Sequence, residues 1–281
     1  MHTDNYWRRR RTLRLLGKGL AVVCVLVFTL FPVYFMVSSA LAERVSTGTD
    51  ALFPDALSLR HFEFVLTEAG FLRYMRNSLL VALVTVVGSG ILALLAAVAV
   101  ARFRFSMRTT VLVMILVIQM VPLEALVISL FLQMSNLGML NSLLGLSIVY
   151  IALSVPFAVW MLRGFVAAIP TEIEEAAYID GASWGRMFVS ILLPLTAPGL
   201  VAVSVFAFIL AWNEFILAFT FMTHSENYTA AVGLRQFFGQ YTTDWGSVMA
   251  ASTLITLPAV VFFLMIQRRI ASGLVAGSVK G

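Results

Sequence analysis

Cysteine and charge are both scarce in this chain, and each shortage narrows the class of protein. Cys24 is the single cysteine among 281 residues, so neither a disulfide framework nor a cysteine metal site can form within the chain. The histidines, His2, His61 and His224, are scattered without ligand spacing, so we expect surface residues and no metal site. Charged residues make up 12% and hydrophobic residues 60%, and the mean hydropathy is +0.96. This composition excludes an ordinary water-soluble domain.

Motifs for nucleotide binding and catalysis are missing as well. Gly17-Lys18-Gly19 lacks the upstream glycine and the following Ser or Thr of a phosphate-binding loop. The sequence has no nucleophile motif and no cluster of His, Cys and carboxylate residues, which argues against a membrane-embedded enzyme. We therefore expect no catalytic residue and no cofactor bound by this chain, and the energy for its activity must come from elsewhere.

Apolar runs of membrane length take up most of the chain. The hydrocarbon core of a bilayer requires about 20 apolar residues for each helical span. The runs lack the alternating pattern of barrel strands, and backbone groups in lipid need internal hydrogen bonds, so each run is predicted to be a helix. The six runs are about Gly19–Leu41, Asn77–Ala101, Thr109–Met134, Asn141–Leu162, Leu195–Met222 and Val248–Ile266. The sequence thus predicts an all-α, polytopic integral membrane protein with six transmembrane helices.

Basic residues are distributed unevenly between the loops that join these runs. Five of the 19 fall on one side of the membrane, which leaves 14 (19 minus 5) on the other. The five are Arg44, Arg60, Arg73, Arg76 and Arg235. The positive-inside rule places the richer side, with both termini and residues 170–194, in the cytoplasm. The net charge of +5 requires no nucleic acid partner, since the basic N-terminus can contact anionic membrane lipid.

The N-terminal segment imitates a secretory signal, because basic residues precede an apolar stretch and the small-residue pattern Ala40-Leu41-Ala42. The stretch contains Pro32 and exceeds the roughly 7–15 residues of a signal's apolar region. We expect a retained first helix, with cleavage as the alternative that an intact mass would reveal. The predicted organisation is a basic N-terminus (1–18), a first helix (19–41), an extracytoplasmic loop (42–76), a core with five helices (77–268) and a C-terminal tail (269–281).

A charged loop at 170–194 interrupts the apolar chain between two predicted spans. Four of the 14 acidic residues lie in its first dozen positions, at Glu172, Glu174, Glu175 and Asp180. Thr171 and Glu174 have the spacing of a capping box, in which the hydroxyl and the carboxylate each accept from a backbone amide. Acidic side chains also favour the positive end of a helix dipole. We therefore expect a helix at the start of the loop.

The rest of the loop carries the signals of a turn and a second short helix. Ala176 and Ala177 keep the first helix slim, and Gly181 can supply the left-handed residue that ends it. Ser183 can cap a second helix that stacks Trp184, Phe188 and Ile191 on one face. The predicted helix–turn–helix is a docking surface in one interpretation and an ordinary interfacial helix pair in the other.

The loop resembles the "EAA" loop of ABC importer permeases, in Glu175-Ala176-Ala177, in Gly181 and in Ile191-Leu192-Leu193-Pro194. In that family the loop seats in a cleft of the ATP-hydrolysing subunit and couples it to the pore. The resemblance implies an ATPase-coupling role for Glu174, Glu175, Ala176, Ala177, Asp180, Gly181, Ala182, Ile191 and Pro194.

The likeness to carbohydrate-uptake permeases continues outside the loop. It includes Asn77-Ser78-Leu79, Leu137-Gly138 with Asn141, Trp160 to Phe165, Trp212-Asn213-Glu214-Phe215 and Thr243 to Gly246. The last nine residues, 273–281, resemble the tail of the maltose-type second permease subunit, which reaches into the ATPase dimer. That likeness implies ATPase contacts for Gly273, Gly277 and Lys280. Ala99-Val100-Ala101 departs from the Ala-Tyr-Ala of many relatives, which is a packing detail.

The resemblance implies an assembly in the plasma (inner) membrane of a prokaryote. A second, homologous permease would pair with this chain, two ATP-binding subunits would dock on loop 170–194 and use ATP and Mg²⁺, and an extracytoplasmic sugar-binding protein would deliver the solute. The expected activity is import of a sugar, a di- or oligosaccharide, by alternating access. The alternatives are a secondary transporter, which usually has more spans and detectable repeats, or an ABC permease for another solute such as glycerol-3-phosphate.

Polar residues inside the predicted spans are candidates for the translocation path, because their burial in lipid is costly. They are Glu124 in the third run and Trp212, Asn213 and Glu214 in the fifth. They either hydrogen-bond and stack on the sugar, or hold helices together. We favour the structural role for Asn213 and Glu214, because the resemblance includes them across permeases for different sugars. The sequence does not identify the sugar.

Overall fold

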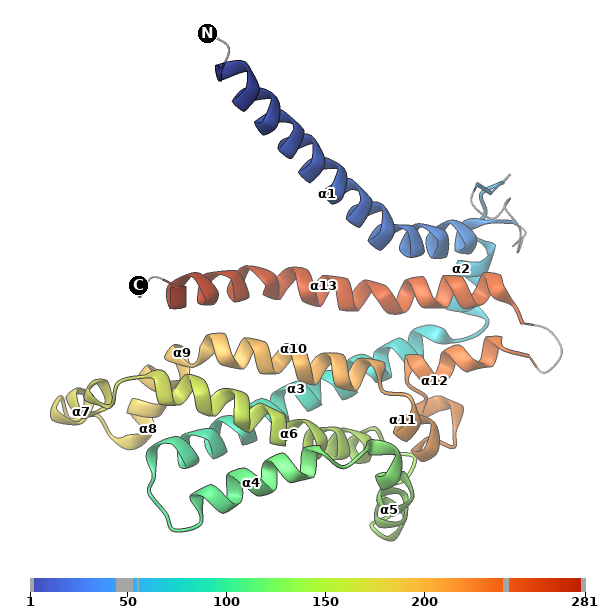
Figure 1. Ribbon diagram of the computed structural model, residues 1–281. Helices are drawn as coiled ribbons and strands as arrows, with labels where there is room; N and C mark the ends of the chain where they lie inside the picture. The colour runs from blue at the N-terminus through green and yellow to red at the C-terminus, as the bar shows by residue number, and fades with distance from the viewer. Residues whose placement is uncertain (1–2, 44–52, 55, 240–242, 279–281) are drawn as a thin grey trace. The chain divides into compact units, whose positions relative to one another are not determined.

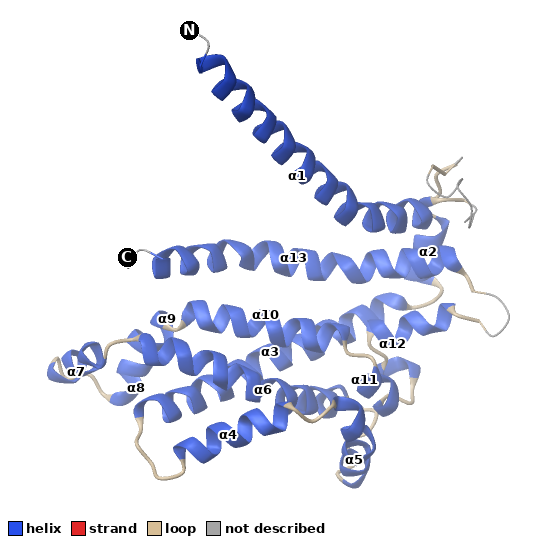
Figure 2. Cartoon of the chain, in the orientation of Figure 1, coloured by secondary structure: helices blue, strands red, loops and turns tan. Residues whose placement is uncertain are grey.

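The structure is a computed structural model that describes residues 3–43, 53–54, 56–239 and 243–278, with side chains described from residue 15 to residue 267 within those ranges. All regular elements in this part of the chain are helices (Figures 1 and 2). The long ones are α1 (Thr3–Leu41), α3 (Phe71–Arg102), α4 (Arg108–Gln119), α5 (Leu123–Asn136), α6 (Leu143–Ala168), α10 (Ala197–Asn213) and α13 (Trp245–Ser278). The chain divides into two compact units, Met1–Gly70 with Phe237–Leu254, and Phe71–Gln236 with Ile255–Gly281.

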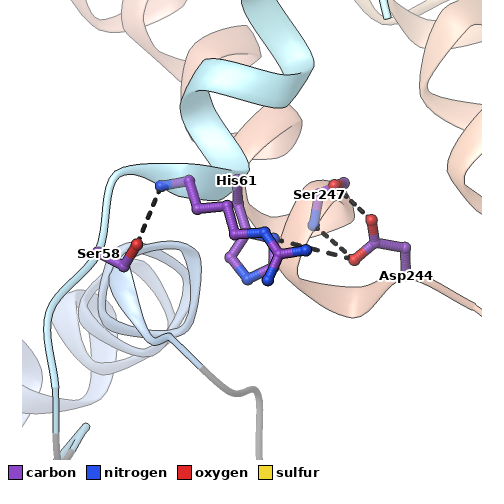
Figure 3. Close-up of polar contacts among 5 residues, drawn as sticks. Ser58, His61, Asp244 and Ser247 are labelled. Atoms are coloured by element: carbon purple, nitrogen blue, oxygen red, sulfur yellow. Dashed lines mark hydrogen bonds and ion pairs between the residues drawn. The ribbon is translucent and has the colours of Figure 1, made fainter. Parts of the chain in front are cut away.

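The first unit contains α1, α2 (Arg60–Thr67) and the first turns of α13. Asp244 caps α13, since its carboxylate accepts from the Ser247 amide at 3.1 Å and from the Ser247 hydroxyl at 2.5 Å. His61 on α2 lies beside this cap, with Nδ1 4.0 Å from Oδ1 of Asp244 (Figure 3). The ring packs so closely on Gly246 that an added Cβ would lie 2.1 Å from Cε1 of His61. The histidine is therefore a packed residue that joins α2 to α13, with a side chain only 17% exposed, and the prediction of a surface position is wrong for it.

The second unit is a bundle in which α3, α6 and α10 run side by side (Figure 1). The middle and one end of the bundle share a cluster built around Tyr150, Leu146, Trp212 and Phe221, against which Phe262 of α13 also packs. A second cluster fills the other end, where α3 and α6 finish and loop 170–194 begins. Ala93, Ala97 and Ala158, all fully buried, let the helices approach closely there, as small residues do between membrane helices.

The spans agree with a polytopic membrane protein, although two of them are not straight. Four described helical segments are long and apolar enough to cross a membrane, and the number rises to six if each of two bent pairs is one span. The pairs are α4 with α5, bent by 99°, and the segment Trp184–Leu195 with α10, bent by 71°. The prediction of one continuous helix at Thr109–Met134 is therefore wrong. Pro122, in extended conformation with φ −64° and ψ 136°, explains the break, because proline has no amide to donate and disfavours helix in the preceding residue.

The fifth predicted span also ends differently. α10 stops at Asn213, and α11 (Ile216–Phe221) starts after the extended residue Glu214. Two short 3₁₀ helices, η3 (Ser225–Asn227) and η4 (Arg235–Phe237), flank α12 (Ala230–Leu234). The prolines at 156 and 258 lie inside continuous helices, so neither breaks its span.

Candidate functional site

Loop 170–194 folds as the predicted helix–turn–helix, with α7 (Thr171–Ile179) and α8 (Trp184–Met187) on either side of a tight turn. The capping box is wrong. Pro170 occupies the N-cap position, Thr171 is already helical, and no side chain caps the helix. The reason lies in Glu174, whose carboxylate points away from the helix start toward a basic partner.

That partner is Arg102, the last residue of α3. Its Nε donates to Oε1 of Glu174 at 2.6 Å, and its Nη2 donates to the carbonyl oxygen of Ile169 at 2.8 Å. Both charged side chains are only 12% exposed. A charge-assisted bond of this length is among the stronger polar contacts in proteins. The start of the loop is thus fixed to the end of α3.

The turn between the two helices depends on glycine. Gly181 has φ +82°, a left-handed conformation, and the amide of Ala182 donates to the carbonyl of Ala177 at 2.9 Å. The Gly181 amide donates to the Tyr178 carbonyl at 3.0 Å, which completes a Schellman motif. Ala177 and Ala182 both contact the second hydrophobic cluster, so the turn is packed as well as hydrogen-bonded.

The second helix is capped by Ser183, whose hydroxyl accepts from the Arg186 amide at 3.4 Å. Trp184 stacks on Phe188 with ring centroids 5.3 Å apart, as the i, i+4 spacing predicts. The chain then widens into a π-helical turn, η2 (Phe188–Leu192), before α9 (Leu193–Leu195). Pro194 explains the wide turn, because its ring would clash with the carbonyl four residues earlier in an α-helix. Ile191 packs against the second cluster, which fixes this end of the loop.

The outward face of the loop is acidic and apolar. Ile179 is 86% exposed, and Tyr178, Trp184 and Ile173 are also exposed. Beside them lie the exposed residues Glu172, Glu175, Ala176, Asp180 and Gly181. Large apolar side chains beside carboxylates are typical of a protein contact. The sequence analysis did not predict that Ile179 and Tyr178 belong to this exposed face. The position of Ile179 directly before the turn signal Asp180-Gly181 could have indicated it.

Glu214 lies at the break between α10 and α11, where its carboxylate replaces missing backbone partners. Oε2 accepts from the Tyr150 hydroxyl at 2.5 Å, and the two carboxylate oxygens accept from the amides of Leu217 at 2.8 Å and Ala218 at 3.1 Å. Through these contacts Glu214 satisfies two of the first amides of α11 and links this helix to α6. They favour the structural role that we expected for this residue.

The other intramembrane candidates differ in exposure. Trp212 is 3% exposed, stacks on Phe208 and donates from Nε1 to the Ile255 carbonyl at 3.2 Å, which also favours a structural role. Asn213 ends α10 and is exposed, with its amide donating to the Ile209 carbonyl at 3.0 Å. Glu124 is exposed in the first turn of α5, directly after the break. Glu124 therefore remains a candidate for the translocation path, and so does Asn213, for which we expected a structural role, because both are exposed.

Three motif residues at the opposite end of the bundle fasten the segment that follows α11. Asn77 donates to the carbonyls of Glu226 at 2.8 Å and Tyr228 at 3.0 Å, and the Ser78 hydroxyl accepts from the Ala230 amide at 2.8 Å. Asn141, at φ 55°, contacts the side chain of His224 and accepts from its amide at 3.1 Å. These residues are architectural.

The residues predicted to contact the ATPase from the C-terminal tail are only partly described. Gly273 and Gly277 lie on α13, which continues to Ser278, whereas Lys280 lies outside the described residues. In the part of the chain with described side chains, no group of three His, Cys, Asp or Glu residues could hold a metal ion.

The fold is that of a polytopic helical membrane protein, and comparison with known proteins identifies its family. The family model described as "Binding-protein-dependent transport system inner membrane component" matches residues 65–275. The chain belongs to this family.

Curated relatives cover nearly the whole chain. The diacetylchitobiose uptake system permease protein DasC of Streptomyces coelicolor is 37% identical over 265 residues, which is 94% of this chain and 96% of the relative. The trehalose/maltose transport system permease protein MalG of Thermococcus litoralis is 35% identical over 276 residues, 97% of this chain and 98% of the relative. The trehalose transport system permease protein SugB of Mycobacterium tuberculosis is 34% identical over 259 residues, covering 92% and 94%. These homologues are permeases of sugar transport systems.

A solved structure shares the fold. A chain in the crystal structure of a bacterial ABC transporter involved in the import of the acidic polysaccharide alginate superposes with a TM-score of 0.79. The match covers 92% of this chain and 97% of the other at 22% identity. It confirms the expected fold class of an ABC importer permease.

Proposed function

We propose that this chain is one of two permease subunits of an ABC importer that moves a di- or oligosaccharide into the cytoplasm. The observation that carries the proposal is loop 170–194. It is anchored to the bundle at Arg102 and presents an acidic and apolar face on which Ile179 is 86% exposed. The chain has no nucleotide-binding motif of its own, so ATP and Mg²⁺ belong to the subunits that dock there.

The proposed orientation places both termini and the loop in the cytoplasm. The distribution of Arg and Lys supports it, with 14 of 19 basic residues on that side. The segment fastened by Asn77 and Asn141 then faces outward, where a sugar-binding protein would deliver the solute. The C-terminal end of α13, with Gly273 and Gly277, would reach the ATP-binding subunits from the same side as the loop, and we assign the same partner to Lys280 further along the sequence.

The proposed mechanism is alternating access driven from the loop. ATP binding closes the two ATP-binding subunits, displaces the loops of both permeases, and turns the helices from inward-open to outward-open. The loop links nucleotide state to pore state only if its contacts differ in free energy between the two. The solute class rests on the relatives, whose names specify diacetylchitobiose, trehalose and maltose.

The test uses the complex purified with its own ATP-binding and permease partners and reconstituted in proteoliposomes. Uptake of radiolabelled diacetylchitobiose, trehalose and maltose is measured with the cognate binding protein, with and without ATP. We expect ATP-dependent uptake of at least one of them and its loss in Ile179→Asp, which removes an apolar contact from the docking face. Met107→Asp is the matched control, because Met107 is also exposed, at 58%, but lies outside the loop. Uptake at the same rate with and without ATP would contradict the proposal. Equal uptake by the Ile179→Asp and Met107→Asp complexes would contradict it as well.

A further inference from the structure

Arg102 joins three segments that are far apart in the sequence. It is the last residue of α3, and its two hydrogen bonds reach 67 and 72 residues along the chain, to Ile169 and Glu174. Ile169 is the C-cap of α6, and Glu174 lies on α7. The carbonyl of a helix C-cap has no partner within its own helix, so the guanidinium supplies a donor that the fold otherwise lacks there. One planar fork thus ties α3, α6 and α7 together.

The ion pair between Arg102 and Glu174 is shielded from solvent, and the charged residues next to it in the sequence take no part in it. Only two ion pairs occur among the described side chains, and Arg102–Glu174 is the one that does not involve a histidine. Arg104, two residues further on, is exposed and has no ion pair in the same part of the structure. The neighbouring carboxylate of Glu175 is also exposed, because consecutive residues on a helix point about 100° apart. Glu174 and Glu175 therefore have different tasks, one inward and one outward.

The remaining support of α7 is slight. Its other buried residue is Ala177, a small side chain that touches the second cluster. α3, in contrast, packs along both α6 and α10 and is central to the bundle. A force applied to the exposed face of α7 can therefore reach α3 through the hydrogen bond between Glu174 and Arg102. The buried apolar surface of α7 is too small to transmit much of that force.

We propose that Arg102 is a positioning residue that makes the loop and the end of α3 move as one body. The proposal rests on the proposed function, because it assigns the path by which displacement of the loop reaches the helices. A charge-assisted contact that is stiff and shielded from water suits this role, since a loop that slides over α3 would dissipate the displacement. The ion pair need not add to overall stability, because burying both charges offsets their attraction.

The first experiment measures whether the two elements move together. Cys24→Ser removes the single cysteine, and nitroxide labels are then attached at Thr171→Cys on α7 and Ala99→Cys on α3, both at exposed positions. Pulsed electron resonance on the complex in lipid gives the distance between labels without nucleotide and with a non-hydrolysable ATP analogue and Mg²⁺. We expect one narrow distance that nucleotide does not change. In Arg102→Ala the distribution should broaden and respond to nucleotide.

The second experiment measures coupling. Arg102→Ala should lower the sugar transported per ATP hydrolysed by at least about fivefold, the lower end of typical coupling between sites, while hydrolysis continues. Arg102→Lys should be intermediate, since an ammonium keeps the charge but not the planar fork. Arg104→Ala is the matched control and should equal wild type.

Glu174→Gln is a second variant that keeps the proposal testable if the Arg102→Ala complex does not assemble. Glutamine keeps the shape of the side chain and an acceptor for Nε of Arg102, but it removes the negative charge. It should broaden the distance and lower the transport ratio in the same direction. A Glu174→Gln or Arg102→Ala complex with the wild-type distance and the wild-type ratio would overturn the proposal. The absence of ATP-driven uptake in the wild-type complex would instead refute the proposed function, and the label distances would still report on the contact.

Discussion

Gly181 offers a prediction whose size follows from the backbone alone. Its φ of +82° is a conformation that L-residues rarely adopt, and, apart from Gly181 and its two chain neighbours, no atom lies within 4 Å of the position that an added Cβ would take. Gly181→Ala therefore adds strain without a clash. A non-glycine residue in the left-handed region costs about 1–2 kcal/mol. That free energy corresponds to roughly a 5- to 30-fold fall in the population of the closed turn relative to its opened forms.

The assay is hydrogen exchange of the loop, read by mass spectrometry with fragmentation to single residues. The amides of Ala182 and Asp180 are the reporters, because Ala182 donates within the Schellman motif to Ala177 at 2.9 Å and Asp180 donates in the last turn of α7 to Ala176 at 3.0 Å. We expect their protection to fall by roughly 5- to 30-fold in Gly181→Ala. The protection of these amides from exchange should decrease in the order Gly, Asn, Ala, Val for the residue at position 181. Asparagine tolerates the left-handed region, whereas a β-branched residue does not.

Gly185→Ala provides the matched control within the same loop. Gly185 lies in α8, has no atom within 4 Å of the added Cβ and has no positive φ. Alanine there should leave protection unchanged or raise it, because alanine favours helix by about 1 kcal/mol over glycine. Equal protection in Gly181→Ala and Gly185→Ala, or a series that follows side-chain size instead of left-handed preference, would refute the reasoning.

Three further predictions concern the polar contacts of the bundle. Tyr150→Phe removes the 2.5 Å bond to Glu214, and unfolding of the purified permease in a denaturant series should show a loss of about 1–2 kcal/mol; a loss no greater than that of Tyr178→Phe, at an exposed position, would contradict it. Trp212→Phe keeps the stack on Phe208 but loses the bond to the Ile255 carbonyl, so the same assay should show a smaller loss, about 0.6 kcal/mol; an unchanged midpoint would count against that bond. Asn77→Asp replaces the donor to two carbonyls by an acceptor, so limited proteolysis should cut residues 223–229 faster than in wild type, and equal rates would show that other contacts hold the segment.

Local signals in the sequence predict the loop better than the spans. Gly181 and Ser183 act through their own backbone neighbourhood, and both predictions about them are confirmed. The break at Pro122 was missed because an apolar run reads the same whether it is straight or bent by 99°. The capping box failed for a related reason. Capping chemistry assigns Glu174 to its own helix, whereas the folded chain brings Arg102 to it from 72 residues away.

The same limit applies to the intramembrane acids, and it shows how their roles can be separated. A carboxylate in a span is costly wherever it lies, so sequence alone assigns Glu124 and Glu214 to one class. The structure separates them by the number of hydrogen bonds that each carboxylate already accepts. Glu214 already accepts three hydrogen bonds from Tyr150, Leu217 and Ala218, which leaves about one of the roughly four lone-pair sites of a carboxylate for a sugar hydroxyl. Glu124 follows a 99° break in its span, is exposed, and has both oxygens available among the described residues. The hydrogen bonds of Glu214 suit a group that holds a broken helix in place, whereas Glu124 keeps the free acceptors that a candidate for the translocation path needs.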